Sequence, residues 1–271
     1  MGKLETALRR AKELHAGKRG SRRESPIAET DADQPGSAGI WQNLARVELD
    51  TDTMARHRLT EGSKQYFGAA MAYNMLRTRL IKRMRDNAWS SVIVTSPNPG
   101  AGKTVTALNL AFSLAREQSQ RTYLIDLDFR VPSLHTYVGV TPTRDITSYL
   151  DGECSASEVV SASAIDRLYF GFNTVQHEYS AELLTSRRMR EFVGALKDND
   201  PNAAIIYDAP PVLAADDVLA FGPLADAVLL VVAEGETSRD DLAKAVDLLS
   251  DVNILGIVLN KSRGIVGDSY Y

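Results

Sequence analysis

Apolar and polar positions follow two different periods along the chain between residues 91 and 260. Short apolar runs rich in β-branched residues predict strands at 91–95, 123–127, 203–207, 227–232 and 254–259. Apolar residues at helical spacing predict helices at 103–118, 183–196 and 239–249. Buried strands that alternate with amphipathic helices are typical of a mostly parallel sheet with helices on both faces. We therefore expect an α/β fold for this part of the chain.

The chain before residue 91 has a different pattern. Residues 3–15 place apolar side chains on one face and basic ones elsewhere, which predicts a short amphipathic helix that either is loosely held or contacts an acidic membrane or a partner. Residues 17–39, rich in Gly, Ser, Pro and charge, predict a flexible linker. The expected organisation is a helix and linker at 1–60, one α/β domain at 61–265 and a short tail at 266–271.

A further helix is predicted at 64–85, ahead of the first core strand. Its second half is crowded with basic side chains, namely Arg77, Arg79, Lys82, Arg83 and Arg85. These form either a solvated helix face or a contact with an acidic partner or neighbouring subunit.

The segment at 96–104, SPNPGAGKT, lies between a predicted strand and a predicted helix, which is the context of a phosphate-binding P-loop. Backbone N–H groups at a helix N-terminus favour an anion, and glycines allow close approach. Lys103 is placed to reach β and γ phosphates and Thr104 to offer a hydroxyl to Mg²⁺. Pro97 stands where the standard pattern has a glycine. The predicted ATP-binding residues are Asn98, Pro99, Gly100, Ala101, Gly102, Lys103, Thr104 and Val105.

Three aspartates lie at the carboxyl ends of predicted strands, the edge where open α/β sheets bind ligands. Asp126 and Asp128 are two residues apart on an extended segment, so their side chains are expected to point the same way. Asp208 ends the run AAIIYD, a placement typical of an aspartate that holds Mg²⁺ directly or through water. Together with the P-loop, these residues predict a site for ATP and Mg²⁺.

Composition narrows the function further. The chain is 44% hydrophobic and 24% charged, with a net charge of −4, so a dedicated nucleic-acid-binding protein is not expected. Its one cysteine, Cys154, forms no intrachain disulfide, which fits a reducing compartment. No apolar run is long enough to cross a membrane, and no signal peptide is evident. We expect a cytoplasmic protein that reaches a membrane only through a partner or a surface helix.

The segments TSPNPGAGKT, LIDLDFRVPSLH and IIYDAPPVL together resemble the bacterial tyrosine kinase family, P-loop proteins related to the ParA and MinD ATPases. This resemblance implies an ATP-dependent protein-tyrosine autokinase that regulates capsule and exopolysaccharide synthesis. It also implies a membrane-embedded polysaccharide co-polymerase as activator, a homo-oligomer, and a location peripheral to the inner membrane through that partner.

The resemblance assigns roles residue by residue. Lys103 is expected to stabilise the transferred phosphoryl group. Thr104, Asp128 and Asp208 are the expected magnesium ligands. The roles of base and metal ligand are divided between Asp126 and Asp128, and the resemblance does not decide which residue has which role. Arg130 holds either phosphate charge or a structural carboxylate, and Asn260 either contacts the base or is a turn residue. The family's phosphorylated tail corresponds to Tyr270 and Tyr271.

The chain departs from the family at the helix before the P-loop. The glutamate and first arginine that join subunits into a ring correspond to Met71 and Asn74, and only Arg77 matches. Two alternatives therefore stay open. One is a partition or positioning ATPase, although these carry a second P-loop lysine where this chain has Asn98. The other is a catalytically weak ATP-binding regulator of a membrane polymerase.

Overall fold

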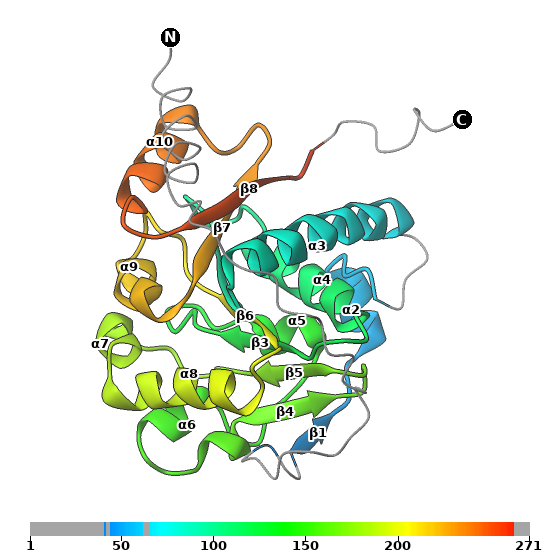
Figure 1. Cartoon of the computed structure of the whole chain (residues 1–271), viewed down its shortest axis with the longest axis vertical. Coiled ribbons are helices and arrows are strands. Elements are labelled where there is room, and N and C mark those ends of the chain that lie inside the picture. Colours follow the sequence, from blue (N-terminus) through cyan, green and yellow to red (C-terminus); the bar gives the residue numbers. More distant parts are fainter. Residues whose placement is uncertain (1–40, 42–43, 62–65, 263–271) are drawn as a thin grey trace, which may run out of the picture.

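One mixed sheet organises the protein (Figure 1). The computed structural model describes residue 41, residues 44–61 and residues 66–262 of the 271-residue chain. The sheet has eight strands in the order β1 (Ala45–Val47), β4 (Val160–Ser163), β5 (Leu168–Gly171), β3 (Thr122–Asp126), β6 (Ala204–Asp208), β2 (Ser91–Thr95), β7 (Ala227–Ala233) and β8 (Ile254–Asn260). The amphipathic helix and the linker expected at 3–39 lie outside the described residues.

The five strands expected from the sequence are β2, β3, β6, β7 and β8, all paired in parallel. Every residue of β2, β3, β6 and β7 is buried, because helices cover both faces of the sheet. This burial explains their continuous apolar runs. The predicted α/β fold is confirmed, and the carboxyl ends of these strands meet at one edge of the sheet.

Three further strands were not expected. β1 and β4 have the sequences ARV and VSAS, which lack the apolar run of a central strand, and β5 is the four-residue segment LYFG. β4 runs antiparallel to β5, while β1 runs parallel to β4 at the end of the sheet. These short strands depend on pairing with their neighbours, which no local pattern reveals.

The folded domain begins before the boundary expected at residue 60. β1 belongs to the sheet, and the helix α2 (Thr51–Arg56) that follows it buries the side chain of Met54 in the core. Leu59 is also fully buried. The backbone N–H of Asp50 donates to the carbonyl of Val138 at 2.9 Å. Part of the stretch assigned to the linker is therefore core structure.

Helices cover both faces of the sheet (Figure 1). One core cluster lies under α2, α3 (Phe67–Asn87), α4 (Lys103–Ala115) and α5 (Leu134–Val138). The other lies under α6 (Ile146–Leu150), α8 (Arg187–Asn199), α9 (Asp217–Phe221) and α10 (Arg239–Leu248). The described residues also form three shorter elements, α7 (Ser180–Leu184), η2 (Ala156–Glu158) and η3 (Gly222–Leu224). Of the helices described, none combines the length and the apolar composition needed to cross a bilayer.

The helix predicted at 183–196 is in fact divided into α7 and α8. Ser186 separates the two, and its hydroxyl accepts a hydrogen bond from the backbone N–H of Met189 at 3.1 Å. A serine in this position satisfies a free donor at the start of a helix, so it begins α8 and interrupts the longer run.

Some of the basic side chains in the second half of α3 make contacts with other parts of the protein. Arg77 donates to the carbonyl of Ser113 at 2.9 Å and lies 3.3 Å from the carboxylate of Glu117. Arg83 donates to the carbonyl of Leu255 in β8. These two arginines tie α3 to α4 and to the sheet, whereas Arg79, Lys82 and Arg85 are exposed.

Candidate nucleotide-binding site

The P-loop connects the carboxyl end of β2 to the first turn of α4, as the sequence predicts. Gly100 and Gly102 have φ of +81° and +87°, a region that side chains disfavour. A Cβ atom on Gly102 would lie 2.2 Å from the Nδ2 atom of Asn260. Glycine is thus required at 102 for both conformation and space.

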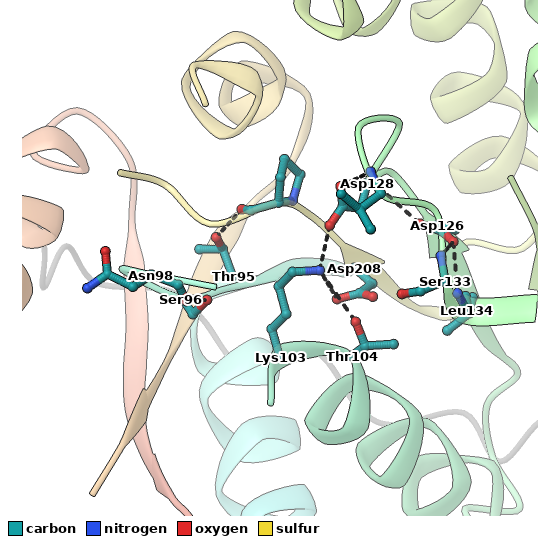
Figure 2. Close-up of polar contacts among 12 residues, drawn as sticks. Thr95, Ser96, Asn98, Lys103, Thr104, Asp126, Asp128, Ser133, Leu134 and Asp208 are labelled. Atoms are coloured by element: carbon teal, nitrogen blue, oxygen red, sulfur yellow. Dashed lines mark hydrogen bonds and ion pairs between the residues drawn. The ribbon is translucent and has the colours of Figure 1, made fainter. Parts of the chain in front are cut away.

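Lys103 occupies the centre of a cluster of side chains from three strand ends (Figure 2). Its Nζ atom lies 2.7 Å from Oδ2 of Asp128 and 3.7 Å from Oδ1 of Asp208. It also donates to the hydroxyl of Thr104 at 3.4 Å. The structure therefore brings together Lys103, Thr104, Asp128 and Asp208, which the sequence singled out separately.

This cluster is almost completely removed from solvent. The relative exposure is 5% for Thr104, 3% for Asp128 and zero for Asp208. Burial disfavours the charged ammonium of Lys103, but the charges of Asp208 and Asp128 outweigh it and raise the lysine pKa. Burial raises the pKa of Asp208, while the charge of Lys103 opposes that shift. A buried group of ionisable side chains is costly for folding alone and is typical of a functional site.

The cluster suits a magnesium ion. Neither carboxylate oxygen of Asp208 accepts a hydrogen bond of normal geometry from the described residues, although both are buried. Within the described part of the chain, no group of three His, Cys, Asp or Glu side chains forms a metal-binding cluster by itself. Mg²⁺ commonly uses one or two carboxylates and completes its shell with water and phosphate oxygens. Thr104, Asp128 and Asp208 supply suitable oxygen atoms for it.

Asp126 and Asp128 do not act alike, because β3 ends at Asp126 and the strand alternation stops there. The Asp126 carboxylate accepts hydrogen bonds from the backbone N–H groups of Asp128, Ser133 and Leu134 at 3.0, 3.3 and 3.1 Å (Figure 2). Burial, and then the charge of Asp208, raise the Asp126 pKa. Asp126 thus holds the loop between β3 and α5, while Asp128 faces Lys103.

Arg130 binds a structural carboxylate, which is one of the two roles left open by the sequence. Its guanidinium donates to Oδ1 of Asp217 at 3.2 Å and 3.3 Å, and this carboxylate is completely buried. A weaker contact of 3.4 Å joins it to the exposed Asp216. Arg130 therefore connects the loop after β3 to the start of α9. The adjacent Asp216 and Asp217 were the only sequence signal for this contact.

Two side chains hold the P-loop from its flanks. The Nδ2 atom of Asn98 donates to Oδ2 of Asp241 in the first turn of α10 at 2.9 Å. The Nδ2 atom of Asn260 donates to the carbonyl of Ala101 at 2.9 Å. Sequence reasoning found Asn260 but missed Asp241, because an aspartate three residues after Ser238 indicates only a capped helix.

A cavity of about 320 Å³ opens beside this cluster. The P-loop, Lys103 and Thr104 line one side, and Asp128 and Arg130 line another. The cavity lies at the carboxyl edge of the sheet, where α/β proteins bind ligands. Tyr270 and Tyr271, the expected phosphoacceptors, lie outside the described residues.

A P-loop, a largely buried lysine and strand-end carboxylates around a cavity define a P-loop nucleotide-binding domain. The family described as the CobQ/CobB/MinD/ParA nucleotide binding domain matches residues 92–267.

Known proteins narrow this class further. Tyrosine-protein kinase YwqD of Bacillus subtilis (strain 168) is 34% identical over 193 residues, covering 70% of this chain and 80% of YwqD. The succinoglycan biosynthesis transport protein ExoP of Rhizobium meliloti (strain 1021) is 32% identical over 179 residues, 63% of this chain and 22% of ExoP. The kinase domain of Escherichia coli tyrosine kinase ETK has 26% identity and a TM-score of 0.67, covering 75% of this chain and 80% of that domain. The chain belongs to the bacterial tyrosine-kinase family.

Proposed function

We propose that this protein is an ATP-dependent protein-tyrosine autokinase acting in capsule or exopolysaccharide synthesis. The observation that carries the proposal is the cluster of Lys103, Asp128 and Asp208 beside the P-loop. Family membership and the kinase names of YwqD and ETK support the same chemistry.

The proposed site binds the phosphates of ATP through the backbone N–H groups of residues 98–105 and through Lys103. When bound, Mg²⁺ would neutralise charge on the β and γ phosphates, and Thr104 and Asp208 would hold it. Asn260, next to Ala101, is the proposed neighbour of the base. The ammonium of Lys103 exchanges its carboxylate partner Asp128 for phosphate oxygens in this proposal.

Asp128 is the proposed proton acceptor and Asp126 a positioning residue. One carboxylate oxygen of Asp128 accepts a hydrogen bond from Nζ of Lys103. Both carboxylate oxygens of Asp126 instead accept hydrogen bonds from backbone N–H groups of its own loop. In the proposed step, the tyrosine hydroxyl oxygen bonds to the γ-phosphorus while the bond from phosphorus to the bridging oxygen of ADP breaks. The phenolic proton passes to Asp128.

The cellular setting is proposed from the relatives. ExoP is named as a succinoglycan biosynthesis transport protein, which supports a role in polysaccharide export. We place the protein in the cytoplasm, at the inner membrane through a membrane-embedded polysaccharide co-polymerase that activates it. Transfer to the tail of a neighbour, with Tyr270 and Tyr271 as acceptors, requires a homo-oligomer. Asn98 bonds to Asp241 of its own chain, which favours the kinase over a partition ATPase that carries lysine there.

A labelling assay tests this proposal. Purified protein is incubated with γ-labelled ATP and Mg²⁺, with and without the cytoplasmic segment of a candidate membrane partner. We expect phosphotyrosine in the wild type, none in Lys103→Met, and none in Tyr270→Phe/Tyr271→Phe. ATP hydrolysis without phosphotyrosine would favour the partition ATPase, and nucleotide binding without either activity would favour the regulator.

A further inference from the structure

Two loops contribute to the wall of the cavity beside the P-loop. One follows β3 and supplies Asp128, Arg130 and Val131, and the other follows β6 and supplies residues 210–211 and 214–215. The proposed proton acceptor, Asp128, lies on the first loop. Its position relative to bound ATP therefore depends on the contacts that hold this loop in place.

The loop after β6 is attached to the segment that leads into the P-loop. The hydroxyl of Thr95 donates to the carbonyl of Pro210 at 2.6 Å, and the N–H of Val212 donates to the carbonyl of Ser96 at 2.8 Å. This loop continues into α9, whose first residue is Asp217. The loop therefore connects Asp217 to the P-loop through a short and hydrogen-bonded stretch of chain.

Arg130 joins the loop after β3 to this second loop. Its guanidinium donates two hydrogen bonds to Oδ1 of Asp217, at 3.2 and 3.3 Å. The other carboxylate oxygen, Oδ2, is also buried and accepts no hydrogen bond of normal geometry from the described residues. A buried ion pair adds little stability, because the cost of desolvation offsets the attraction. A requirement for geometry at the site explains this pair better than stability does.

Arg130 belongs to the same short turn as Asp128. Oδ1 of Asp128 accepts a hydrogen bond from the N–H of Val131 at 2.9 Å, and Oδ2 lies 2.7 Å from Nζ of Lys103. Arg130 immediately precedes Val131 in the chain, so a displacement of Arg130 also displaces the N–H group that orients the Asp128 carboxylate.

A separate contact holds the residue between Asp128 and Arg130. The N–H of His177 donates to the carbonyl of Phe129 at 2.8 Å, and Nε2 of His177 lies 3.1 Å from the hydroxyl of Thr147 in α6. The loop after β3 is thus held toward α6 by its backbone and toward α9 by the Arg130 side chain.

We propose that Asp217 is a positioning residue that, through Arg130, holds Asp128 in the place that phosphoryl transfer requires. The inference rests on the proposed kinase function and adds a residue that does not line the cavity. A displacement of about 1 Å at a reacting group is enough to lower a rate about 10²-fold. The P-loop binds the phosphates of ATP without this ion pair, so the expected effect is on turnover and not on nucleotide affinity.

Steady-state kinetics tests the proposal in a Tyr270→Phe/Tyr271→Phe background, with a peptide of residues 263–271 as acceptor. Asp217→Ala removes the acceptor of Arg130 and should lower kcat about 10²-fold, while KM for ATP stays unchanged. Asp217→Asn keeps an oxygen that accepts from the guanidinium and should retain most of the rate. The matched control is Asp216→Ala, which removes the exposed neighbour 3.4 Å from Arg130 and should behave like its parent.

Two double variants separate positioning from a loss of stability or a direct contact with substrate. In an Asp128→Asn background, Asp217→Ala should cause little further loss, because it acts through Asp128. Arg130→Ala/Asp217→Ala leaves no unpaired charge, and its kcat should equal that of Asp217→Ala. Losses that multiply in either comparison would overturn the positioning role. Urea denaturation confirms that each variant is folded under the assay conditions.

Amide hydrogen exchange measures the hold on the loop without any catalysis. We expect the N–H of Val131 to exchange faster in Asp217→Ala than in the parent or in Asp216→Ala. Such faster exchange together with a parent that forms no phosphotyrosine would refute the kinase and leave the hold of Asp217 on the loop standing. An active parent with the same kcat as Asp217→Ala would refute the positioning role and leave the kinase standing.

Discussion

At the scale of single residues, the site is defined by carboxylates with different tasks. Asp208 is buried with no hydrogen bond of normal geometry from the described residues, Asp128 faces Lys103, and Asp126 binds backbone N–H groups. The sequence predicted that all three lie at the carboxyl edge. It could not divide their tasks, because that depends on where β3 ends and how the following loop folds back.

Exchanging each aspartate of the β3 loop separately tests this division. Asp128→Asn removes the proton acceptor and should lower the rate of tyrosine phosphorylation by about 10²–10⁴-fold. Asp126→Asn keeps an acceptor oxygen for the N–H of Leu134 and should keep most of the rate, whereas Asp126→Ala should not. Steady-state kinetics with a peptide of residues 263–271 as the acceptor measures the phosphorylation rate of all three variants. A loss in Asp126→Asn as large as that in Asp128→Asn would contradict the assignment.

Asp226 stabilises the opposite edge of the sheet. Its Oδ2 atom accepts from the backbone N–H groups of Ser90 and Ser91 at 2.9 and 2.8 Å, and Oδ1 lies 3.2 Å from Lys197. Burial opposes its charge, but the hydrogen bonds from both serines and the charge of Lys197 hold its pKa below the ordinary value of 3.8. Its contribution to stability is therefore complete above that value and is lost as pH falls through the lower, folded-state pKa.

Asp226→Ala leaves two backbone donors without their acceptor and should lower the free energy of unfolding by about 1–3 kcal/mol at pH 7. The difference from wild type should shrink below about pH 4, where the unfolded-state carboxyl is protonated. Urea denaturation at several pH values measures it, with the exposed Asp166→Ala as control. A difference that stays constant down to the lowest pH would show that the charge of Asp226 has no part in it.

At the scale of elements, segments with a strong apolar pattern were predictable, and short segments without such a pattern were not. Central strands such as β7 and helices such as α4 have clear apolar patterns in their sequences, and their positions agree with the prediction within a few residues. β1, β4 and α5 have three to five residues each and depend on pairing or packing far along the chain. The contact between Asn98 and Asp241 was equally hidden, because the two residues are 143 positions apart.

The contact between Asn98 and Asp241 joins the P-loop to α10, and a double-mutant cycle measures its value for nucleotide binding. Asn98→Ala and Asp241→Ala should each weaken MgATP binding about fivefold, the equivalent of about 1 kcal/mol for one hydrogen bond. The double variant should be no weaker than either single variant. Asp240→Ala, an exposed neighbour in α10, is the control. Effects that simply add would show that the two side chains act independently.

At the scale of the whole molecule, the parallel sheet gathers the site from distant parts of the chain. The P-loop follows β2, Asp128 follows β3, Asp208 ends β6 and Asn260 ends β8, so four strand ends contribute (Figure 1). The sequence predicted this convergence because the carboxyl ends of parallel strands share one edge. It did not predict the apolar side of the cavity, where loop residues such as Val131 and Pro211 lie with Tyr137 of α5 and show no periodic pattern.

The central claim is that the buried cluster around Lys103 binds the phosphates of ATP with Mg²⁺. Calorimetric titration of MgATP into wild type, Lys103→Met and a control variant tests it most directly. The control is Leu248→Glu, which changes an exposed side chain at the end of α10. We predict saturable heat with one site per chain in wild type and in Leu248→Glu, and a loss of at least about tenfold in affinity for Lys103→Met. No binding heat in the folded wild type, or equal affinity in Lys103→Met, would contradict the account.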